Sequence, residues 1–252
     1  MSLTWGQGNQ TIASVTQAFQ DAEVVPDVLA SFSPRALLDV VFTDNSSMQA
    51  LNVTPGMNLT TAQTANEPQF FLRANGTLQA NASYVLAIVD PDAPTPQNTS
   101  ISQFRHFLGG GFQVDNSTSQ LQNTSAALSD FAPPTPPDGS DPHRYVVLVF
   151  DQPNGFNASA QPLVNASTPR NNFNLTTFGQ AVGLGNPIAG NFFLTGPGND
   201  STSGNATNSA SGSSPTSTDT TGTNGAHPDR SMKGMGWFIL GGVLCSAGPT
   251  IL

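Results

Sequence analysis

The chain has 252 residues, of which 37% are hydrophobic and 9% are charged, and its 16 acidic and 7 basic side chains give a formal net charge of -9. Nucleic-acid binding requires clustered Lys and Arg. This chain has one lysine, Lys233, and no basic cluster, so nucleic acid is excluded as a partner. The single cysteine, Cys245, lies near the C-terminus, which excludes disulfides and cysteine nucleophiles from the rest of the chain.

The first part of the chain combines a polar segment with the first predicted elements of a domain. Residues 1–22 are polar without a strong periodic pattern, whereas residues 23–196 carry nearly all the aromatic and periodic apolar residues, enough for one core. Residues 25–32 predict a short helix with Pro26 at its first position. The apolar runs 36–42 and 69–73 predict strands.

Two further runs predict the centre of a sheet. Residues 84–89 and 145–150 are β-branched and aromatic, which is typical of buried strands. The predicted strands follow one another directly, which favours an antiparallel arrangement over alternating strand–helix units. Residues 174–184 predict a helix that is ended by Gly183 and Gly185.

A rigid acidic turn follows the first central strand. Its sequence is Asp90-Pro91-Asp92-Ala93-Pro94, and its prolines fix the backbone and disfavour helix at the residues before them. Two carboxylates are thereby held at the edge of a sheet. Taken alone, such a turn is more typical of carboxylates that cap backbone amides than of a functional site.

Two histidines accompany this turn. His106 lies in residues 103–108, another predicted strand, where a single histidine is typically a satisfied core group. His143 lies at the start of the second central strand. The Pro-rich stretch 132–139 precedes His143 and predicts a stiff, extended loop that could form a pocket wall.

The C-terminal part predicts a tether. Residues 197–235 are rich in Ser, Thr, Gly and Asn and predict a disordered stalk. Residues 236–252 are apolar, but a spanning helix needs about 20 such residues. Asn224 begins a group of small residues before a polar spacer and this tail, which is the pattern of a glycosylphosphatidylinositol (GPI) signal with Asn224 as the attachment candidate. A short tail anchor is the alternative.

Fourteen Asn-x-Ser/Thr sequons favour passage through the secretory route. Residues 1–10 show neither the basic start nor the apolar stretch of a signal peptide, so we expect a trimmed or misassigned start. The expected location is the extracellular side of the plasma membrane or the cell wall, with a lipid anchor in the membrane. The glycosylation candidates are Asn45, Asn58, Asn75, Asn81, Asn98, Asn116, Asn123, Asn157, Asn165 and Asn174.

Further motifs lie in a fixed order around the turn and the histidines. They are Arg105-His106-Phe107-Leu108, His143-Arg144-Tyr145-Val146, and the stretches 170–178 and 183–193. Together with the turn, they resemble the phosphatidylethanolamine-binding protein family, which includes Raf kinase inhibitor protein and the yeast carboxypeptidase Y inhibitor. The resemblance runs from about Glu23 to Leu194 and suggests a fungal-type, GPI-anchored member.

The resemblance implies a mainly β fold, with antiparallel β-sheets packed as a sandwich and a few short helices. It also implies a small pocket for phosphate or a phospholipid head group. Neither a cofactor nor a bound metal is expected. One departure is Thr135, where the family usually has glycine before its Pro-Pro, so we expect narrower backbone access to an anion there. The pocket residues implied by the motifs are Asp90, Asp92, His106, Pro136, His143 and Tyr145.

The chemistry of these residue types fits an anion, with one qualification. Carboxylates repel an anion, so the expected role of the two aspartates is to orient His106 and His143. Imidazolium and the Tyr145 hydroxyl can donate hydrogen bonds to phosphate oxygens. We therefore expect phosphate binding to strengthen as the pH falls through about 6.5, the ordinary histidine pKa.

Three functions are compatible with these residues to different degrees. The leading hypothesis is a binding protein for a small phosphorylated anion or phospholipid head group. The alternative is an inhibitor of a serine carboxypeptidase-type protease, with residues 1–22 contacting the enzyme. Asp90, Asp92 and the two histidines could in principle bind a metal, but the chain has no Gly-x-Ser-x-Gly, His-Glu-x-x-His or phosphate loop, so catalysis is not expected.

Overall fold

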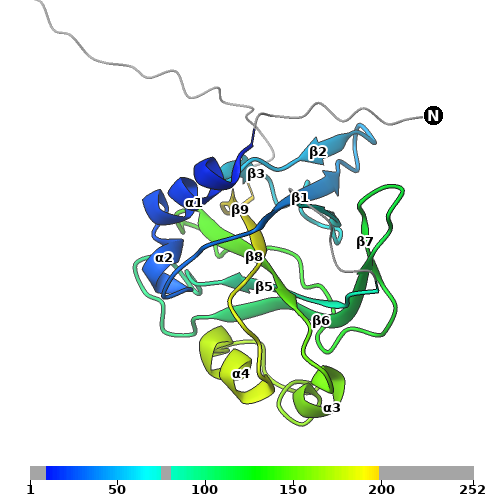
Figure 1. The fold of residues 1–252 in the computed structure, drawn as a ribbon. Helices are drawn as coiled ribbons and strands as arrows, with labels where there is room; N and C mark the ends of the chain where they lie inside the picture. The colour runs from blue at the N-terminus through cyan, green and yellow to red at the C-terminus, as the bar shows by residue number, and fades with distance from the viewer. Residues whose placement is uncertain (1–9, 75–80, 199–252) are drawn as a thin grey trace, which may run out of the picture. The chain divides into compact units, whose positions relative to one another are not determined.

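The computed structural model describes residues 10–74 and 81–198, and strands dominate there (Figure 1). The elements in chain order are α1 (Ile12–Asp21), α2 (Val24–Asp27), β1 (Ala36–Thr43), β2 (Ala50–Asn52), β3 (Met57–Leu59), β4 (Gln69–Ala74), β5 (Tyr84–Asp90), β6 (Phe104–Val114), β7 (Leu121–Asn123), β8 (His143–Asp151), α3 (Phe156–Ala160), α4 (Leu175–Val182) and β9 (Ala189–Thr195).

A six-stranded sheet in the order β3-β9-β8-β5-β6-β7 forms the centre of the domain. Its pairings are antiparallel except that of β3 with β9, which is parallel. Every residue of β5 is buried, and β8 is buried except at Arg144 and Asp151. The prediction that these two apolar runs form the central strands is therefore confirmed.

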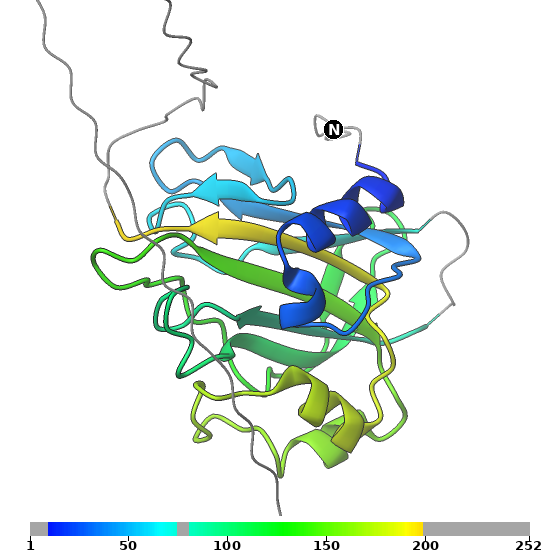
Figure 2. The same ribbon diagram turned by 90° about the vertical axis from the view of Figure 1, so that its left-hand side faces the viewer.

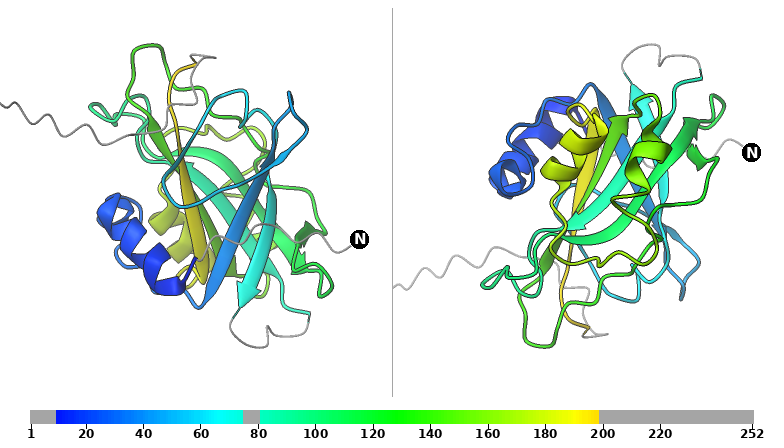
Figure 3. Two further views of the ribbon diagram at one scale, coloured as in Figure 1. Left: turned by 90° about the horizontal axis from the view of Figure 1, so that it is seen from above. Right: turned by 90° about the horizontal axis from the view of Figure 1, so that it is seen from below.

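The two faces of this sheet pack against different layers. Side chains alternate between faces along a strand, so Val85 and Val89 join one core cluster, whereas Tyr84 and Leu86 join the other. The first cluster includes the helices and the second includes the three-stranded sheet β2-β1-β4. Figure 2 shows α1 and α2, in blue, lying over β8 and β9, and the left view of Figure 3 shows β1 and β4 on the other side. The expected antiparallel β-sandwich is thus confirmed, with a helical layer added to it.

The N-terminal segment contains a helix that the sequence pattern does not predict. Thr11 and Ser14 form a capping box at the start of α1. Val15 and Phe19 are buried, and the Phe19 ring stacks on the Phe32 ring with 4.1 Å between centroids. The core therefore uses residues on the N-terminal side of the boundary expected at Glu23.

The two helix predictions have different outcomes. A helix over residues 25–32 is wrong, because α2 spans four residues and Val25 within it is non-helical at φ -106° and ψ 113°. A residue before proline is disfavoured in the helical region, and Pro26 follows Val25. The second prediction is confirmed by α4, where Asn174 caps the first turn and Gly183 ends the helix at a φ of 73°.

Several predictions concern side chains at the surface or segments outside the described residues. Nine of the glycosylation candidates are exposed, as a glycan requires, and their occupancy stays a prediction. Asn75, Asn224 and the predicted stalk and tail from residue 199 onward lie outside the described residues. Among the residues that the structure does describe, none of the helices has the length and apolar character to cross a membrane.

Candidate functional site

A β-bulge in β6 places His106 beside the start of β8. Ile88 pairs with Phe107 and Val89 pairs with Arg105, so His106 is the extra residue between them. A bulge re-aims a side chain relative to simple alternation. The His106 ring consequently contacts Tyr145 edge-on at 4.9 Å between centroids, while Arg105 lies against Phe173 at 5.1 Å.

Four of the predicted site residues form one buried cluster. Asp90 ends β5, His143 and Tyr145 begin β8, and His106 comes from the bulge. The Asp90 Oδ2 atom lies 2.8 Å from His143 Nδ1 and 4.0 Å from His106 Nε2. None of the four residues is more than 4% exposed, so the cluster is nearly closed to solvent.

The partner of His106 fixes where its proton lies. His106 Nδ1 lies 2.7 Å from the Ala132 carbonyl oxygen, and a carbonyl only accepts, so Nδ1 carries the hydrogen and Nε2 is bare in the neutral ring. Burial lowers the pKa of His106, and the Arg170 and His143 charges add to this effect against the opposing effects of the Ala132 carbonyl and Asp90. The ring is therefore neutral at pH 7, and its Nε2 becomes a donor only on acidification.

His143 is held at both ring nitrogens. Its Nδ1 donates to the Asp90 carboxylate at 2.8 Å, and its Nε2 lies 3.0 Å from the Ser140 hydroxyl. The same hydroxyl donates to the Asp141 carbonyl oxygen at 2.8 Å. The expected orienting role of Asp90 thus applies to His143, whereas the Ala132 carbonyl orients His106.

The Tyr145 hydroxyl is the open donor of the cluster. Among the described residues it has no hydrogen-bond partner. The ring stacks on Phe193 with 5.2 Å between centroids, which fixes its orientation. Burial raises the pKa of Tyr145, and the charges of Asp90 and Asp92 raise it further, so the phenol keeps its proton and can donate.

One wall of the cluster is formed by the Pro-rich segment of residues 132–142, which we call the 132–142 loop. Its ends supply the Ala132 carbonyl and the Ser140 hydroxyl to the two histidines. Pro136 is buried in this loop, whereas Thr135 is exposed, so the Thr135 side chain does not fill the space beneath the loop. The loop both covers the cluster and occupies two of its four imidazole nitrogens.

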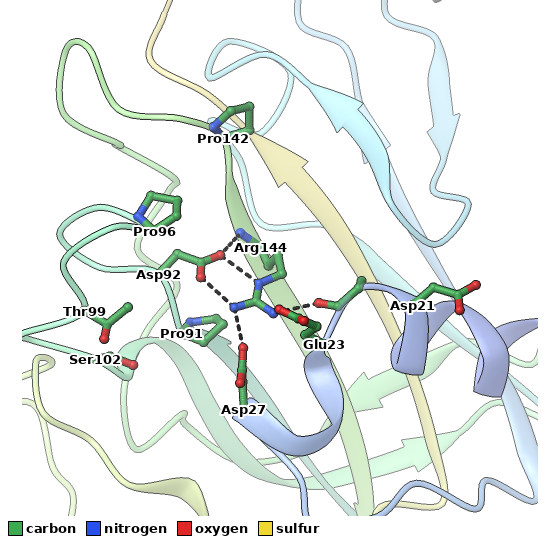
Figure 4. A pocket seen from close by; sticks show the side chains of 11 residues that line it. Asp21, Glu23, Asp27, Pro91, Asp92, Pro96, Thr99, Ser102, Pro142 and Arg144 are labelled. Carbon is green, nitrogen blue, oxygen red and sulfur yellow. Dashed lines mark hydrogen bonds and ion pairs between the residues drawn. The ribbon is translucent and has the colours of Figure 1, made fainter. Parts of the chain in front are cut away.

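Asp92 lies apart from the other predicted residues. Its backbone N–H donates to Asp90 Oδ1 at 2.7 Å, but its carboxylate binds Arg144 through two oxygens, with Arg144 Nε at 2.9 Å and NH2 at 2.7 Å (Figure 4). Alternation along β8 directs Arg144 to the face opposite His143 and Tyr145. The structure therefore brings Asp90 to the histidines and directs Asp92 to the other face of the sheet.

A hollow of about 550 Å³ surrounds the Asp92–Arg144 pair (Figure 4). Asp21, Glu23 and Asp27 also line it. Arg144 also donates to Asp27 at 2.8 Å and to the Ala22 carbonyl, so each of its three guanidinium nitrogens is engaged. Burial opposes the charge of Arg144, but hydrogen bonds with Asp92 and Asp27 raise its pKa overall. Because the positive charge of Arg144 is already paired and four carboxylates line the hollow, the hollow is unfavourable for binding an anion.

The described ranges 10–74 and 81–198 contain no group of three or more His, Cys, Asp or Glu side chains arranged to hold a metal ion. The four residues that could in principle have bound one are divided between the two faces of the sheet, because Asp92 pairs with Arg144. This arrangement gives no support to a metal site.

Three residues that contact the predicted site residues are not predicted by the sequence pattern: Ala132, Ser140 and Arg144. Ala132 acts through its carbonyl, which no side-chain pattern reveals, and Ser140 is one of many serines. The direction of Arg144 could have been predicted, because it follows His143 directly and consecutive side chains on a strand point to opposite faces. Its pairing with Asp92 follows from that direction.

Comparisons with known proteins find related sequences. A model of the family described as phosphatidylethanolamine-binding protein matches residues 46–193. A 26 kDa secreted antigen of Toxocara canis is 35% identical over 179 residues, which cover 69% of this chain but only 62% of the antigen. The carboxypeptidase Y inhibitor of Saccharomyces cerevisiae is 30% identical over 165 residues, which cover 54% of this chain and 72% of the inhibitor.

Solved structures show the same fold. The carboxypeptidase Y inhibitor in complex with its cognate proteinase has a TM-score of 0.65 at 22% identity, covering 77% of this chain and 100% of the inhibitor. A phosphatidylethanolamine-binding protein from Plasmodium vivax has a TM-score of 0.59 at 17% identity, covering 73% of this chain and 98% of that protein. Since the family model matches more than half of the sequence and the fold agrees, the chain belongs to the phosphatidylethanolamine-binding protein family.

Proposed function

We propose that this chain is a binding protein, not a catalyst, that holds the phosphate of a phospholipid head group or a similar phosphorylated anion against Tyr145 and His106. The observation that carries the proposal is the open Tyr145 hydroxyl, which has no hydrogen-bond partner among the described residues and lies beside His106. A phenol hydroxyl without a protein partner is free to donate a hydrogen bond to a ligand.

Protonation of His106 adds a second hydrogen-bond donor beside the Tyr145 hydroxyl. The hydroxyl of Tyr145 donates at any ordinary pH, and His106 Nε2 donates once the ring is protonated. Asp90 lies behind His143 and fixes that ring through Nδ1. Because the cluster is almost closed to solvent, ligand entry requires the 132–142 loop to move and the Ser140 hydroxyl to leave His143.

The test is calorimetric titration of the full chain with glycerophosphoethanolamine. Replacing Tyr145→Phe removes one hydroxyl and keeps the ring, so we expect at least about a tenfold loss of affinity, the usual value of a hydrogen bond to a charged group. The matched control is Tyr84→Phe. Tyr84 is the other tyrosine of the chain, is as buried as Tyr145, and lies at the opposite end of β5 from Asp90. Equal affinity of the Tyr145→Phe variant and the unchanged protein would refute the proposal.

We also propose that the domain works outside the cell on a lipid anchor. The support is the exposure of nine candidate sequons and the description of one relative as a secreted antigen. Treatment of cells with a phosphatidylinositol phospholipase should release the protein, and mass spectrometry of the product should find a glycan remnant on Asn224 and N-glycans on the exposed sequons. Release of none of the protein would count against the anchor.

A second candidate function is inhibition of a serine carboxypeptidase-type protease. It is favoured by the similarity to the carboxypeptidase Y inhibitor in sequence and fold. Within residues 1–22, the side chains of Val15 and Phe19 in α1 are buried in the core, so these two are not available to contact the enzyme. Residual activity of a serine carboxypeptidase mixed with the full chain measures inhibition, and the Tyr145→Phe variant should inhibit equally if the pocket is not involved.

A further inference from the structure

A separate cavity of about 470 Å³ lies where the start of β6, the segment 163–174 and α4 meet. This size lies within the range of small-molecule sites. Leu163 is 46% exposed at the cavity, and only one other large hydrophobic side chain, Met48, is as exposed in the described part of the chain. The apolar residues that line the cavity are Leu163, Val164, Pro169, Phe173, Phe178 and Ala181.

Arg105 contributes a buried positive charge to this apolar cavity. It is 2% exposed, and its NH2 group donates to the Thr168 carbonyl and hydroxyl oxygens, both at 3.1 Å. Its Nε has no hydrogen-bond partner, and its guanidinium lies 5.1 Å from the Phe173 ring. A guanidinium keeps its charge in proteins, and a buried charge without a counter-ion is unfavourable.

The surroundings of Arg105 differ from those of three other arginines in the described residues. Arg35, Arg73 and Arg144 each pair with a carboxylate, whereas Arg105 has no such ion pair in the described ranges. Instead, Arg170 donates to the Arg105 carbonyl oxygen at 3.2 Å. Burial and the Arg170 charge lower the pKa of Arg105 to about 10. The cavity therefore lacks the negative charge that would stabilise this side chain.

We propose that this cavity binds an amphipathic monocarboxylate of the fatty-acid type, with its carboxylate on Arg105 and its apolar chain between Phe173, Phe178 and Leu163. The two oxygens of a carboxylate match the fork of a guanidinium. Arg105 is the one charged side chain among the lining residues, and the other polar ones are uncharged Thr and Asn, so the cavity matches the single charge of a monocarboxylate better than a phosphate dianion. The site is distinct from the proposed head-group cluster, because Arg105 packs on Phe173 in one core cluster, whereas His106 contacts Tyr145 in the other.

The probes are decanoate and its neutral counterpart decanol, titrated calorimetrically into the full chain at pH 7. We expect one decanoate per chain and at least about tenfold weaker binding of decanol. Arg105→Met removes the charge and keeps an unbranched side chain, so decanoate affinity should fall to that of decanol. Arg35→Met is the matched control, because Arg35 is exposed and pairs with Asp151 elsewhere on the domain. This control should bind decanoate unchanged.

A second variant keeps the test decisive if Arg105→Met does not fold. Ala181 is exposed on α4 and lines the cavity, so Ala181→Phe should fill the apolar part and weaken both probes without touching Arg105. The Tyr145→Phe variant should bind decanoate normally, which separates this site from the proposed function. No decanoate binding at millimolar concentration, equal affinity for both probes, or loss of binding in Tyr145→Phe would each overturn the inference.

Discussion

At the scale of single residues, the direction of each side chain decides which predicted group belongs to the cluster. Asp90, His106, His143 and Tyr145 were predictable from their motifs and do meet in the structure. The family resemblance also implies Asp92 as a pocket residue, yet its carboxylate binds Arg144 on the other face. The bulge that turns His106 could not be predicted, because its sequence offers no glycine or break in the apolar pattern.

The pH dependence of binding follows from His106. Its folded pKa lies below 6.5 because of burial, and a bound phosphate would raise it, so binding takes up a proton. Affinity for glycerophosphoethanolamine should therefore rise as the pH falls below 6.5 and continue to rise until the pH reaches the lowered pKa. The ligand is a phosphodiester, so its own charge does not change in this range. Calorimetric titrations from pH 8 to pH 5 measure the effect.

A substitution at the same position provides the control. His106→Gln keeps a nitrogen donor near the position of Nε2 but removes the titration. The variant should bind with an affinity that is independent of pH in this interval. An unchanged profile in His106→Gln would assign the proton to another group, and a flat profile in the unchanged protein would contradict the mechanism.

At the scale of elements, long apolar runs and the capped helix α4 were predictable, whereas very short strands and a helix with few buried positions were not. The runs at β5 and β8 are buried on both faces, so their composition alone identifies them. In α1, only Val15 and Phe19 are buried, four residues apart within a polar segment, and two positions are too few for a periodic signal. The strand β3 has three residues and pairs with β9 in parallel, a contact that depends on the whole fold.

The cap of α4 gives a stability prediction. The Asn174 side chain accepts from the Thr177 N–H at 2.8 Å. Asn174→Ala removes this cap and should lower the free energy of unfolding by about 1 kcal/mol, a fall in Tm of about 2–4 °C for a domain of this size. Asn174→Asp is the matched control, since it keeps an accepting oxygen and also removes the sequon. Equal loss in both variants, measured by thermal unfolding, would assign the effect to the glycan instead of the cap.

At the scale of the whole molecule, the six-stranded sheet separates two cores with different coverings. The core on the helix side of the sheet includes α1, whose Phe19 ring contacts the Phe32 and Phe192 rings at 4.1 and 5.5 Å between centroids. The predicted start of the domain at Glu23 leaves this helix out. Its burial means that the N-terminal helix contributes to the stability of the sheet that carries both proposed sites.

Truncation of Phe19 measures this contribution. Phe19→Ala leaves a cavity between α1 and the sheet and should lower the free energy of unfolding by about 3–5 kcal/mol. Gln17→Ala on the exposed side of the same helix should change it by less than about 0.5 kcal/mol. Chemical denaturation of the full chain gives both values. A small effect of Phe19→Ala would mean that α1 is detached from the core in solution.

The 132–142 loop has a kinetic consequence. Because it covers the cluster and bonds both histidines, the phosphate cannot reach Tyr145 by simple collision. Loop opening must precede association, and such openings occur on microsecond to millisecond timescales. In stopped-flow mixing, the observed association rate should level off at high ligand concentration instead of rising in proportion to it. The plateau would report the opening rate of the loop, and Ser140→Ala, which frees the loop from His143, should raise it.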